Sequence, residues 1–520
     1  MGRIRGTVFL AGSLGLFAAA PLKADWYEAS SEHFVIYADD SEKDIKEFAE
    51  NLERFHSAMV VLTGRETEMP SPSNRVTIFV VGDRGDLRRL SRGNRNVAGF
   101  YQPRAGASRA FVQDIKMKSG YPSFSTVVLL HEYAHHFLIS SSRFAMPRWL
   151  SEGAAEFFSS SSFEKDGGMK TGRPAHHRAT EISYDGAVPA EDLLDSAYSR
   201  DSGGTNRGSF YGTSWALFHM LWFSDERQGQ LNEYWQAVAA GKGSLEAGRE
   251  VFGDLDVLDD ELEDYMRQRR MLYLPLAADN LPPTASVVLR ELPEGEAKMM
   301  DVRMVSQRGV TREEALELVE KARKIAERYP DDAGVLVALA EAEHDAGNYQ
   351  AAIEVATRAI ALDPARPNAY VQKGYAQFAL AAEADEADKD LAYREAMGTF
   401  GALNRIENDH PLPLIYYYRS FLEQGREPNE TARRALERAA ELAPFDQALA
   451  MNAGLMLAGE GKIGRAIDAL TPLASDPHGG ELPDTARRYI AQLEREEEGT
   501  VWIPRDTAKA VGNAVTAAEE

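Results

Sequence analysis

The pattern of apolar and polar positions changes character near the middle of the chain. In the first part, short apolar runs at residues 33–37 and 75–81 predict buried strands, and residues 41–62 carry apolar side chains at helical spacing. Residues 98–102 and 109–112 flank a segment containing Pro and Gly, which predicts a β-hairpin. This alternation predicts an α+β unit.

The second part, from about residue 311 to 494, is rich in Ala, Leu, Glu and Arg and is punctuated by proline. Pro330, Pro364, Pro411, Pro444 and Pro477 are separated by 34, 47, 33 and 33 residues. A period near 34 is that of the tetratricopeptide (TPR) repeat, and the longer spacing indicates an insertion around residues 382–390. We expect an all-α TPR solenoid with its own core and a concave face. It either supports the first unit or recruits a protein partner.

The most informative chemistry lies in an apolar run, residues 127–139, that predicts a buried helix. This run contains His131, Glu132 and His135 in the pattern H-E-x-x-H. Residues four apart lie on one helical face, so both imidazoles can bind one tetrahedral Zn2+. A carboxylate beside them can take the proton of a water activated by the metal, which makes Glu132 the candidate general base.

A second motif, P-R-W-L-S-E-G-A-A-E, follows after a gap of 16 residues between His135 and Glu152. Glu152 and Glu156 are again four residues apart, on a helix that Pro147 helps to start. Carboxylates on an apolar helix are costly to bury unless they are paired or bind a metal. Glu152 is therefore the candidate third ligand, with His176 and His177 in reserve.

Together the two motifs resemble the gluzincin group of zinc peptidases, and most of all the bacterial peptidase MA type domains. The resemblance covers about residues 25–225, with only the two motifs closely matched. It implies a zincin-like fold, Glu152 as third zinc ligand and Glu156 as the carboxylate that holds a ligand imidazole. It also implies that one strand of the 98–112 hairpin pairs with extended substrate, although an interior hairpin is an equal alternative.

The resemblance extends to the apolar helix expected over residues 210–223. Similar domains carry a tyrosine at the start of this helix, which matches Tyr211. Its hydroxyl is a candidate catalytic donor to the oxyanion of the tetrahedral intermediate, with core packing as the alternative. His219, further along the same helix, is expected to be a core histidine, and His136 is expected not to bind metal.

The N-terminal segment and the composition narrow the expected location, site chemistry and partners of the protein. Residues 1–24 have the basic start and short apolar stretch of a signal peptide, which predicts export to the periplasm and no stable membrane span after cleavage. The absence of cysteine excludes disulfides and thiolate zinc sites. A net charge of −23 disfavours nucleic acid as a partner.

We therefore expect a signal peptide (1–24), a zincin-like metallopeptidase domain (25–290), TPR-like repeats (305–495) and a tail (496–520) that is loosely ordered after Thr500. The expected function is hydrolysis of peptide bonds in a peptide or protein substrate by zinc-activated water, with Glu132 as base. The alternative is a non-catalytic TPR scaffold that carries a vestigial protease fold. Because the repeats are expected to bury their own core, the first unit is expected to fold without residues 311–520.

Overall fold

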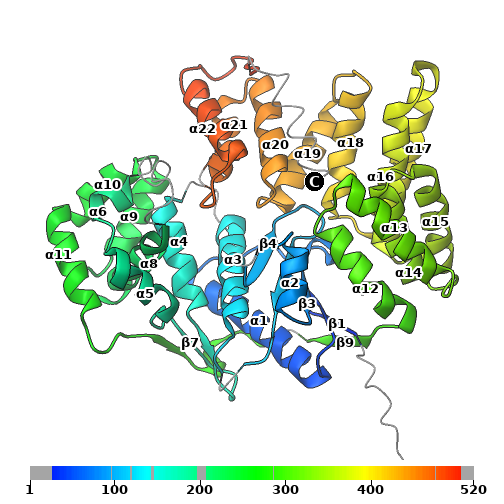
Figure 1. Ribbon diagram of the computed structural model, residues 1–520. Helices are drawn as coiled ribbons and strands as arrows, with labels where there is room; N and C mark the ends of the chain where they lie inside the picture. The colour runs from blue at the N-terminus through cyan, green and yellow to red at the C-terminus, as the bar shows by residue number, and fades with distance from the viewer. Residues whose placement is uncertain are drawn as a thin grey trace, which may run out of the picture.

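The computed structural model describes residues 26–94, 97–117, 120–141, 146–195, 207–284, 286–474 and 476–504. An α+β unit comes first, and a long series of helices, residues 294–493, follows it; we call this series the helical array. In Figure 1 the array begins beside the sheet at α12 and passes over the unit to α22, above α3. The expected signal peptide lies outside the described residues.

The α+β unit is built on a six-stranded mixed sheet in the order β4-β5-β3-β2-β1-β9. Its strands are β1 (Tyr27–Ser30), β2 (Phe34–Ala38), β3 (Val76–Val81), β4 (Gly99–Gln102), β5 (Arg109–Gln113) and β9 (Val288–Glu291). β2, β3 and β5 are parallel, whereas β4 pairs antiparallel with β5 from Gly99 opposite Val112 to Gln102 opposite Arg109. The expected strands and hairpin are confirmed, and β4 lies at an edge of the sheet.

Helices cover one face of this sheet and continue into a helical half. α1 (Glu42–Thr63) and α3 (Phe124–Ser141) contact the strands, and α4 (Arg148–Ser159) packs between α3 and α8 (Arg207–Phe223). The remaining elements of the unit are α2 (Arg84–Leu90), α5 (His176–Asp185), α6 (Ala190–Leu194), α9 (Gln230–Ala239), α10 (Ser244–Phe252), α11 (Leu255–Met266), β6 (Ser162–Phe163), β7 (Met169–Thr171), β8 (Leu274–Leu276) and the 3-10 helices Pro72–Asn74 and Ala278–Asn280.

The helical array is a solenoid of antiparallel helix pairs. Its helices are α12 (Glu294–Gln307), α13 (Arg312–Ala326), α14 (Ala333–Asp345), α15 (Tyr349–Leu362), α16 (Pro367–Glu383), α17 (Glu386–Ile406), α18 (Pro411–Glu423), α19 (Glu430–Leu442), α20 (Gln447–Gly459), α21 (Ile463–Ala474) and α22 (Glu481–Leu493). Ala340, Ala352 and Ala356 are fully buried where α14 meets α15. The expected helical repeats are confirmed, and the insertion lengthens α16 and α17 rather than forming a loop.

The array and the α+β unit share an apolar core. Tyr37, Phe79 and Phe111, on the face of the sheet opposite α1, pack in one cluster with residues of α12, α13 and α14 such as Met300 and Leu339. The repeats therefore do not bury their core alone, and the expectation that they do so is wrong. The reason is that the sheet has two apolar faces and α1 and α3 cover one of them.

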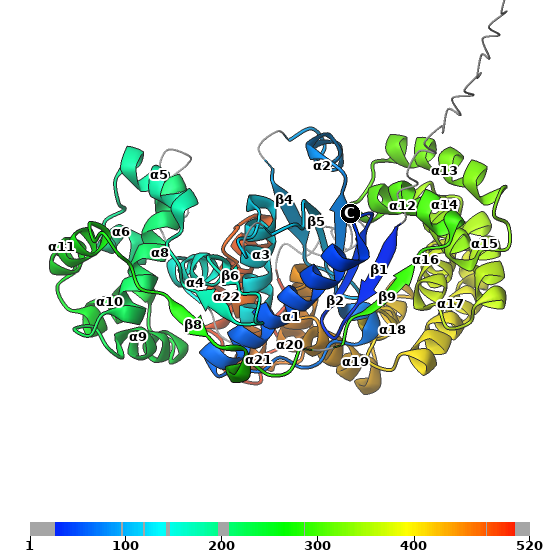
Figure 2. The same ribbon diagram turned by 90° about the horizontal axis from the view of Figure 1, so that it is seen from below.

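The loop between β4 and β5 also reaches the array. The backbone N–H of Ala105 donates to Asp446 at the start of α20 (2.8 Å), and Gly106 lies against Leu412 of α18. Figure 2, seen from below, shows the sheet flanked by the array along one side. Since helices from α12 to α19 contact the α+β unit, and Asp446 at the start of α20 holds its loop, the array is fixed to the unit at several points.

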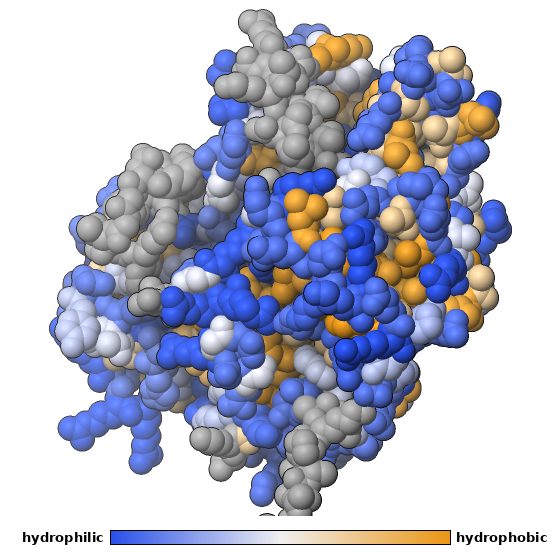
Figure 3. All heavy atoms as spheres, turned by 45° about the vertical axis from the view of Figure 1, so that its right-hand side comes forward, coloured by the Kyte–Doolittle hydropathy of each residue, from blue (hydrophilic) through white to orange (hydrophobic). Residues whose placement is uncertain are grey.

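The segment after α22 is ordered over its first residues. The Trp502 ring is buried 5.3 Å from the Tyr489 ring, and its backbone N–H donates to the Ala458 carbonyl (3.0 Å). The expectation of a loose tail is wrong for residues 501–504, because Trp502 has an apolar cluster to enter; residues 505–520 lie outside the described part. On the face seen in Figure 3, hydrophilic side chains predominate with apolar ones among them. None of the helices in the described ranges has the length and apolarity needed to cross a bilayer.

Candidate metal centre

The helix α3 presents His131 and His135 toward α4. The helix begins after Ser123, whose hydroxyl accepts the Thr126 N–H (3.2 Å), and its apolar side chains bury it on most sides. Both histidines lie on the face toward α4, where their Nε2 atoms are 3.1 Å apart. The one-turn spacing therefore produces the convergence that the sequence predicts.

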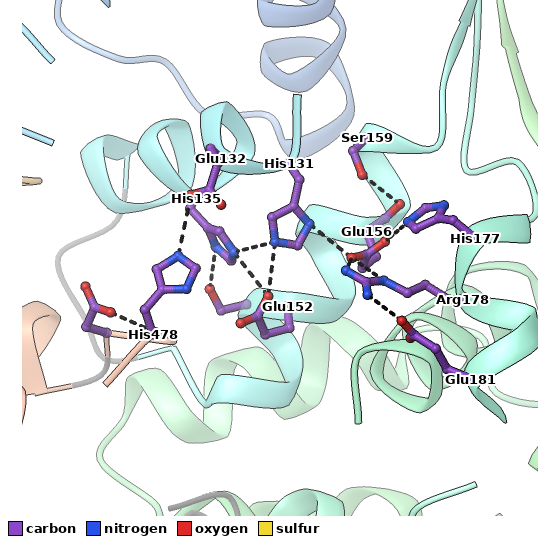
Figure 4. A network of polar contacts seen from close by, with 12 residues as sticks. His131, Glu132, His135, Glu152, Glu156, Ser159, His177, Arg178, Glu181 and His478 are labelled. Carbon is purple, nitrogen blue, oxygen red and sulfur yellow. Dashed lines mark hydrogen bonds and ion pairs between the residues drawn. The ribbon is translucent and has the colours of Figure 1, made fainter. Parts of the chain in front are cut away.

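The third donor comes from α4. Glu152 is fully buried, and its Oε2 lies 3.2 Å from Nε2 of His131 and 3.2 Å from Nε2 of His135 (Figure 4). The glycine that follows it allows α4 to approach α8 closely, since a Cβ on Gly153 would lie 2.5 Å from the Ser214 carbonyl oxygen. The structure thus brings together the three residues predicted as ligands.

These three donors fit zinc in chemistry and in spacing. Two imidazole nitrogens and a carboxylate oxygen form a nearly equilateral triangle with sides of 3.1–3.2 Å. A tetrahedral zinc with bonds of about 2.0–2.1 Å separates its donors by roughly 3.3 Å and leaves a fourth position open. Among the described residues, Oε1 of Glu152 is buried without a hydrogen-bond partner, which is costly unless a cation lies nearby.

Glu156 lies behind the triangle and contacts one of the ligands. Its Oε1 is 3.3 Å from Nδ1 of His131, and the carboxylate also binds Nε2 of His177 (2.8 Å) and the guanidinium of Arg178 (2.6 and 2.8 Å). The predicted contact between Glu156 and a ligand imidazole is present. Sequence reasoning missed Arg178, whose guanidinium compensates the buried charge, and it placed His177 only as a reserve ligand.

Hydrogen bonds and charge fix the states of the ligands. Nδ1 of His135 lies 3.1 Å from the Ser151 hydroxyl. Burial lowers the pKa of His131, but the Glu156 and Glu152 carboxylates outweigh burial and raise this pKa to about 10. Burial raises the pKa of Glu152, yet its contacts with His131 and His135 hold that pKa below its ordinary value. A metal at this site would compete with the proton that these carboxylates favour on His131.

The Glu132 side chain points away from α4. It lies next to a residue that the sequence analysis did not single out. Its Oε2 lies 3.5 Å from Nε2 of His478, which follows α21 in the helical array (Figure 4). Burial raises the pKa of Glu132, whereas His478 lowers it, and the net result is a pKa below the ordinary value. No local pattern could have revealed this pairing, because it joins distant parts of the chain.

Tyr211 lies near the site, on the first turns of α8. Its ring centroid is 6.4 Å from that of His131, and the Arg178 guanidinium carbon lies 4.7 Å from the centre of its ring. Burial, with the Glu152 charge, raises the pKa of Tyr211 to about 12, so the phenol stays protonated and can donate. This position is compatible with both a catalytic and a packing role.

Two further histidines, His219 and His136, lie away from the triangle. His219 is fully buried and contacts the Tyr265 hydroxyl (2.7 Å) and the Gly172 carbonyl (2.9 Å), as expected of a core histidine. His136 faces away, with its Nδ1 2.6 Å from the Tyr101 hydroxyl. His131, His135 and Glu152 form the one group of three in the described residues whose donor atoms converge on a common point.

Comparisons with known proteins yield likenesses of fold alone. No protein-family model matches the chain, and no curated protein matches it. Among solved structures, a thermophilic TPR protein of Thermus thermophilus is 14% identical, with a TM-score of 0.31, over 38% of this chain and 98% of that one. MamA of Desulfovibrio magneticus is 18% identical, with a TM-score of 0.26, over 39% of this chain and 97% of that one. Likenesses this weak say nothing of activity.

Proposed function

We propose that the chain is an exported zinc-dependent peptidase whose α+β unit is a gluzincin-type domain. The observation that carries the proposal is the buried triangle of two imidazole nitrogens and one carboxylate oxygen, with sides of 3.1–3.2 Å. Its donors match the preference of zinc, and Glu132 lies beside them on the same helix. Buried ligands, a candidate base and a supporting carboxylate in one place are the features of a catalytic rather than a purely structural site.

Each residue has a role that follows from its position. His131, His135 and Glu152 would hold the metal, and the chemistry that zinc supplies there is activation of water and polarisation of a carbonyl. Glu132 accepts the proton of the attacking water through its carboxylate and delivers it to the leaving amine. Glu156 keeps the His131 ring oriented through Nδ1. Tyr211 supplies a protonated phenol near His131.

The sheet offers a way to hold an extended substrate. β4 is an edge strand and packs beside α3, the helix that carries the two histidines. An extended peptide that added to this edge would run along the metal site, with its backbone held by hydrogen bonds that do not depend on sequence. This supports a peptide or an unfolded protein segment as substrate, rather than a folded surface.

A direct test measures metal and activity on the same full-length protein. We expect about one zinc per chain and hydrolysis of unstructured peptides, both abolished by Glu152→Ala. Glu132→Gln should keep the zinc and lower kcat by at least about 100-fold, because the base is lost while the ligands remain. Wild-type protein that binds no zinc would instead support the other prediction from the sequence, a TPR scaffold with a vestigial protease fold.

A further inference from the structure

The array supplies a residue to the candidate active site through the connection between α21 and α22. In this connection Asp476 accepts the His478 backbone N–H (2.8 Å) and the Gln447 side-chain amide (2.7 Å), which ties the segment to α20. Gly479 and Gly480 follow, with φ of +68° and +125°, conformations that residues with a Cβ rarely adopt. The backbone at His478 is thus held in a defined turn.

The array is in turn held on α3, so the turn cannot shift freely. The Phe445 ring, just before α20, lies 4.3 Å from the His136 ring, next in sequence to a ligand. Ile139 of α3 packs against the apolar cluster of α20, α21 and α22. Glu407, after α17, accepts both the backbone N–H and the hydroxyl of Ser73 (2.8 Å each). These contacts place the turn over α3.

His478 then reaches two residues of the H-E-x-x-H motif. Its Nε2 is 3.5 Å from Oε2 of Glu132, and its ring centroid is 5.5 Å from that of His135. About half of the His478 side chain is exposed (49%), and 21% of the Glu132 side chain, so both side chains of the pair are in contact with solvent.

Resting on the function proposed above, we propose that His478 is a positioning residue for Glu132, so that the helical array completes the active site of the peptidase. The terminal torsion of a glutamate is broad, and a free carboxylate therefore samples many orientations. A donor at one oxygen selects one orientation and leaves the second oxygen available to take a proton. The imidazole thus acts through Glu132 and not on the substrate itself.

Steady-state kinetics of zinc-loaded, full-length variants on one unstructured peptide test this role. We expect His478→Ala to keep its zinc and its KM and to lose about 10- to 100-fold in kcat, as for other residues that orient catalytic groups. His478→Gln should recover part of the loss, because its side-chain amide donates at similar reach. His344→Ala is the matched control and should behave as wild type, because His344 is a partly exposed histidine of α14 in the same array whose described side-chain contacts are with Tyr349, Tyr375 and Asp345.

The outcomes separate this inference from the proposed function. Wild-type kcat in a zinc-loaded His478→Ala variant would overturn the positioning role while leaving the peptidase intact. A higher kcat or a lower KM would also overturn it and would identify the turn as an obstruction to substrate. Equal losses in His478→Ala and His478→Gln would show that donation to Glu132 is not the cause. Wild-type protein without zinc or hydrolysis would refute both proposals together.

Discussion

Replacing Glu156 with glutamine removes one charge from a buried network and leaves its shape almost unchanged. The carboxylate is 1% exposed, accepts hydrogen bonds from His177 Nε2 and two nitrogens of Arg178, and lies 3.3 Å from His131 Nδ1 as an ion-pair contact. Glutamine keeps one acceptor oxygen, but it carries no charge to attract Nδ1 of His131 and the Arg178 guanidinium. Glu156→Gln therefore weakens the contact that holds the His131 ring.

The size of the effect follows from two roles of Glu156: it orients a ligand imidazole, and it forms a buried ion pair with Arg178. Loss of the partner of a ligand imidazole weakens zinc affinity by about 10- to 100-fold, or roughly 1.4–2.7 kcal/mol. Breaking a buried ion pair on one side costs about 3 kcal/mol of folding free energy, because the Arg178 guanidinium keeps its charge. The metal-free variant should therefore be less stable by that amount and should also bind zinc more weakly.

Competition with a chromophoric chelator measures the affinity, and denaturant unfolding in a chelating buffer measures the metal-free stability. Glu181→Gln is the matched control, since Glu181 also binds Arg178 (3.0 Å) but its side chain is 29% exposed and its described ion pair is with Arg178 rather than with His131. We expect the control to keep wild-type zinc affinity. Wild-type affinity in Glu156→Gln would refute the orienting role and reduce Glu156 to a packing residue.

Three further outcomes are expected. Deleting residues 311–520 should give an insoluble or poorly folded protein, because it removes the α13 and α14 residues that pack in one cluster with Phe79 and Phe111. A soluble truncation that unfolds cooperatively would contradict the shared core. Burial lowers the pKa of His219 to about 4, below about 6.5 when unfolded, so its contribution to stability is complete above pH 6.5 and is lost as the pH falls toward 4. In metal-free protein, the loss of unfolding free energy between about pH 7 and pH 5 should be about 2 kcal/mol smaller in His219→Asn, and an equal loss would show that His219 is not the group. Tyr211→Phe should keep its zinc and lower kcat about 100-fold, whereas unchanged kcat would assign Tyr211 to packing.

The metal triangle was predictable because each of its parts is local. Helical spacing alone puts His131 and His135 on one face of α3, and it puts Glu152 and Glu156 on one side of α4. The sequence also showed that both helices are apolar, which predicts that they pack together. Local periodicity was equally sufficient for the strands around residues 34 and 76 and for the helix pairs of the array.

The parts that could not be predicted depend on which distant segments meet. β9 has an exposed, irregular pattern and becomes a strand only because β1 presents a free edge, pairing Tyr27 with Glu291. Arg178 compensates Glu156 from a helix with no recognisable motif. His478 lies between two helices of the array and carries no signal of catalysis. The sequence shows that a buried apolar or charged residue needs a partner in the fold, but it does not show which residue that partner is.

The loop between β4 and β5 lies against helices of the array, and these contacts bear on whether the array supports the first unit or recruits a partner. Asp446, at the start of α20, accepts the Ala105 N–H, and Leu412 of α18 lies against Gly106. The buried Glu341 of α14 lies close enough to Arg109 for their charges to interact. The first helices of successive pairs thus hold the chain's own hairpin, which favours the supporting role. A protein partner recruited through these helices would have to displace that hairpin and, with it, the edge strand β4 that we propose binds substrate.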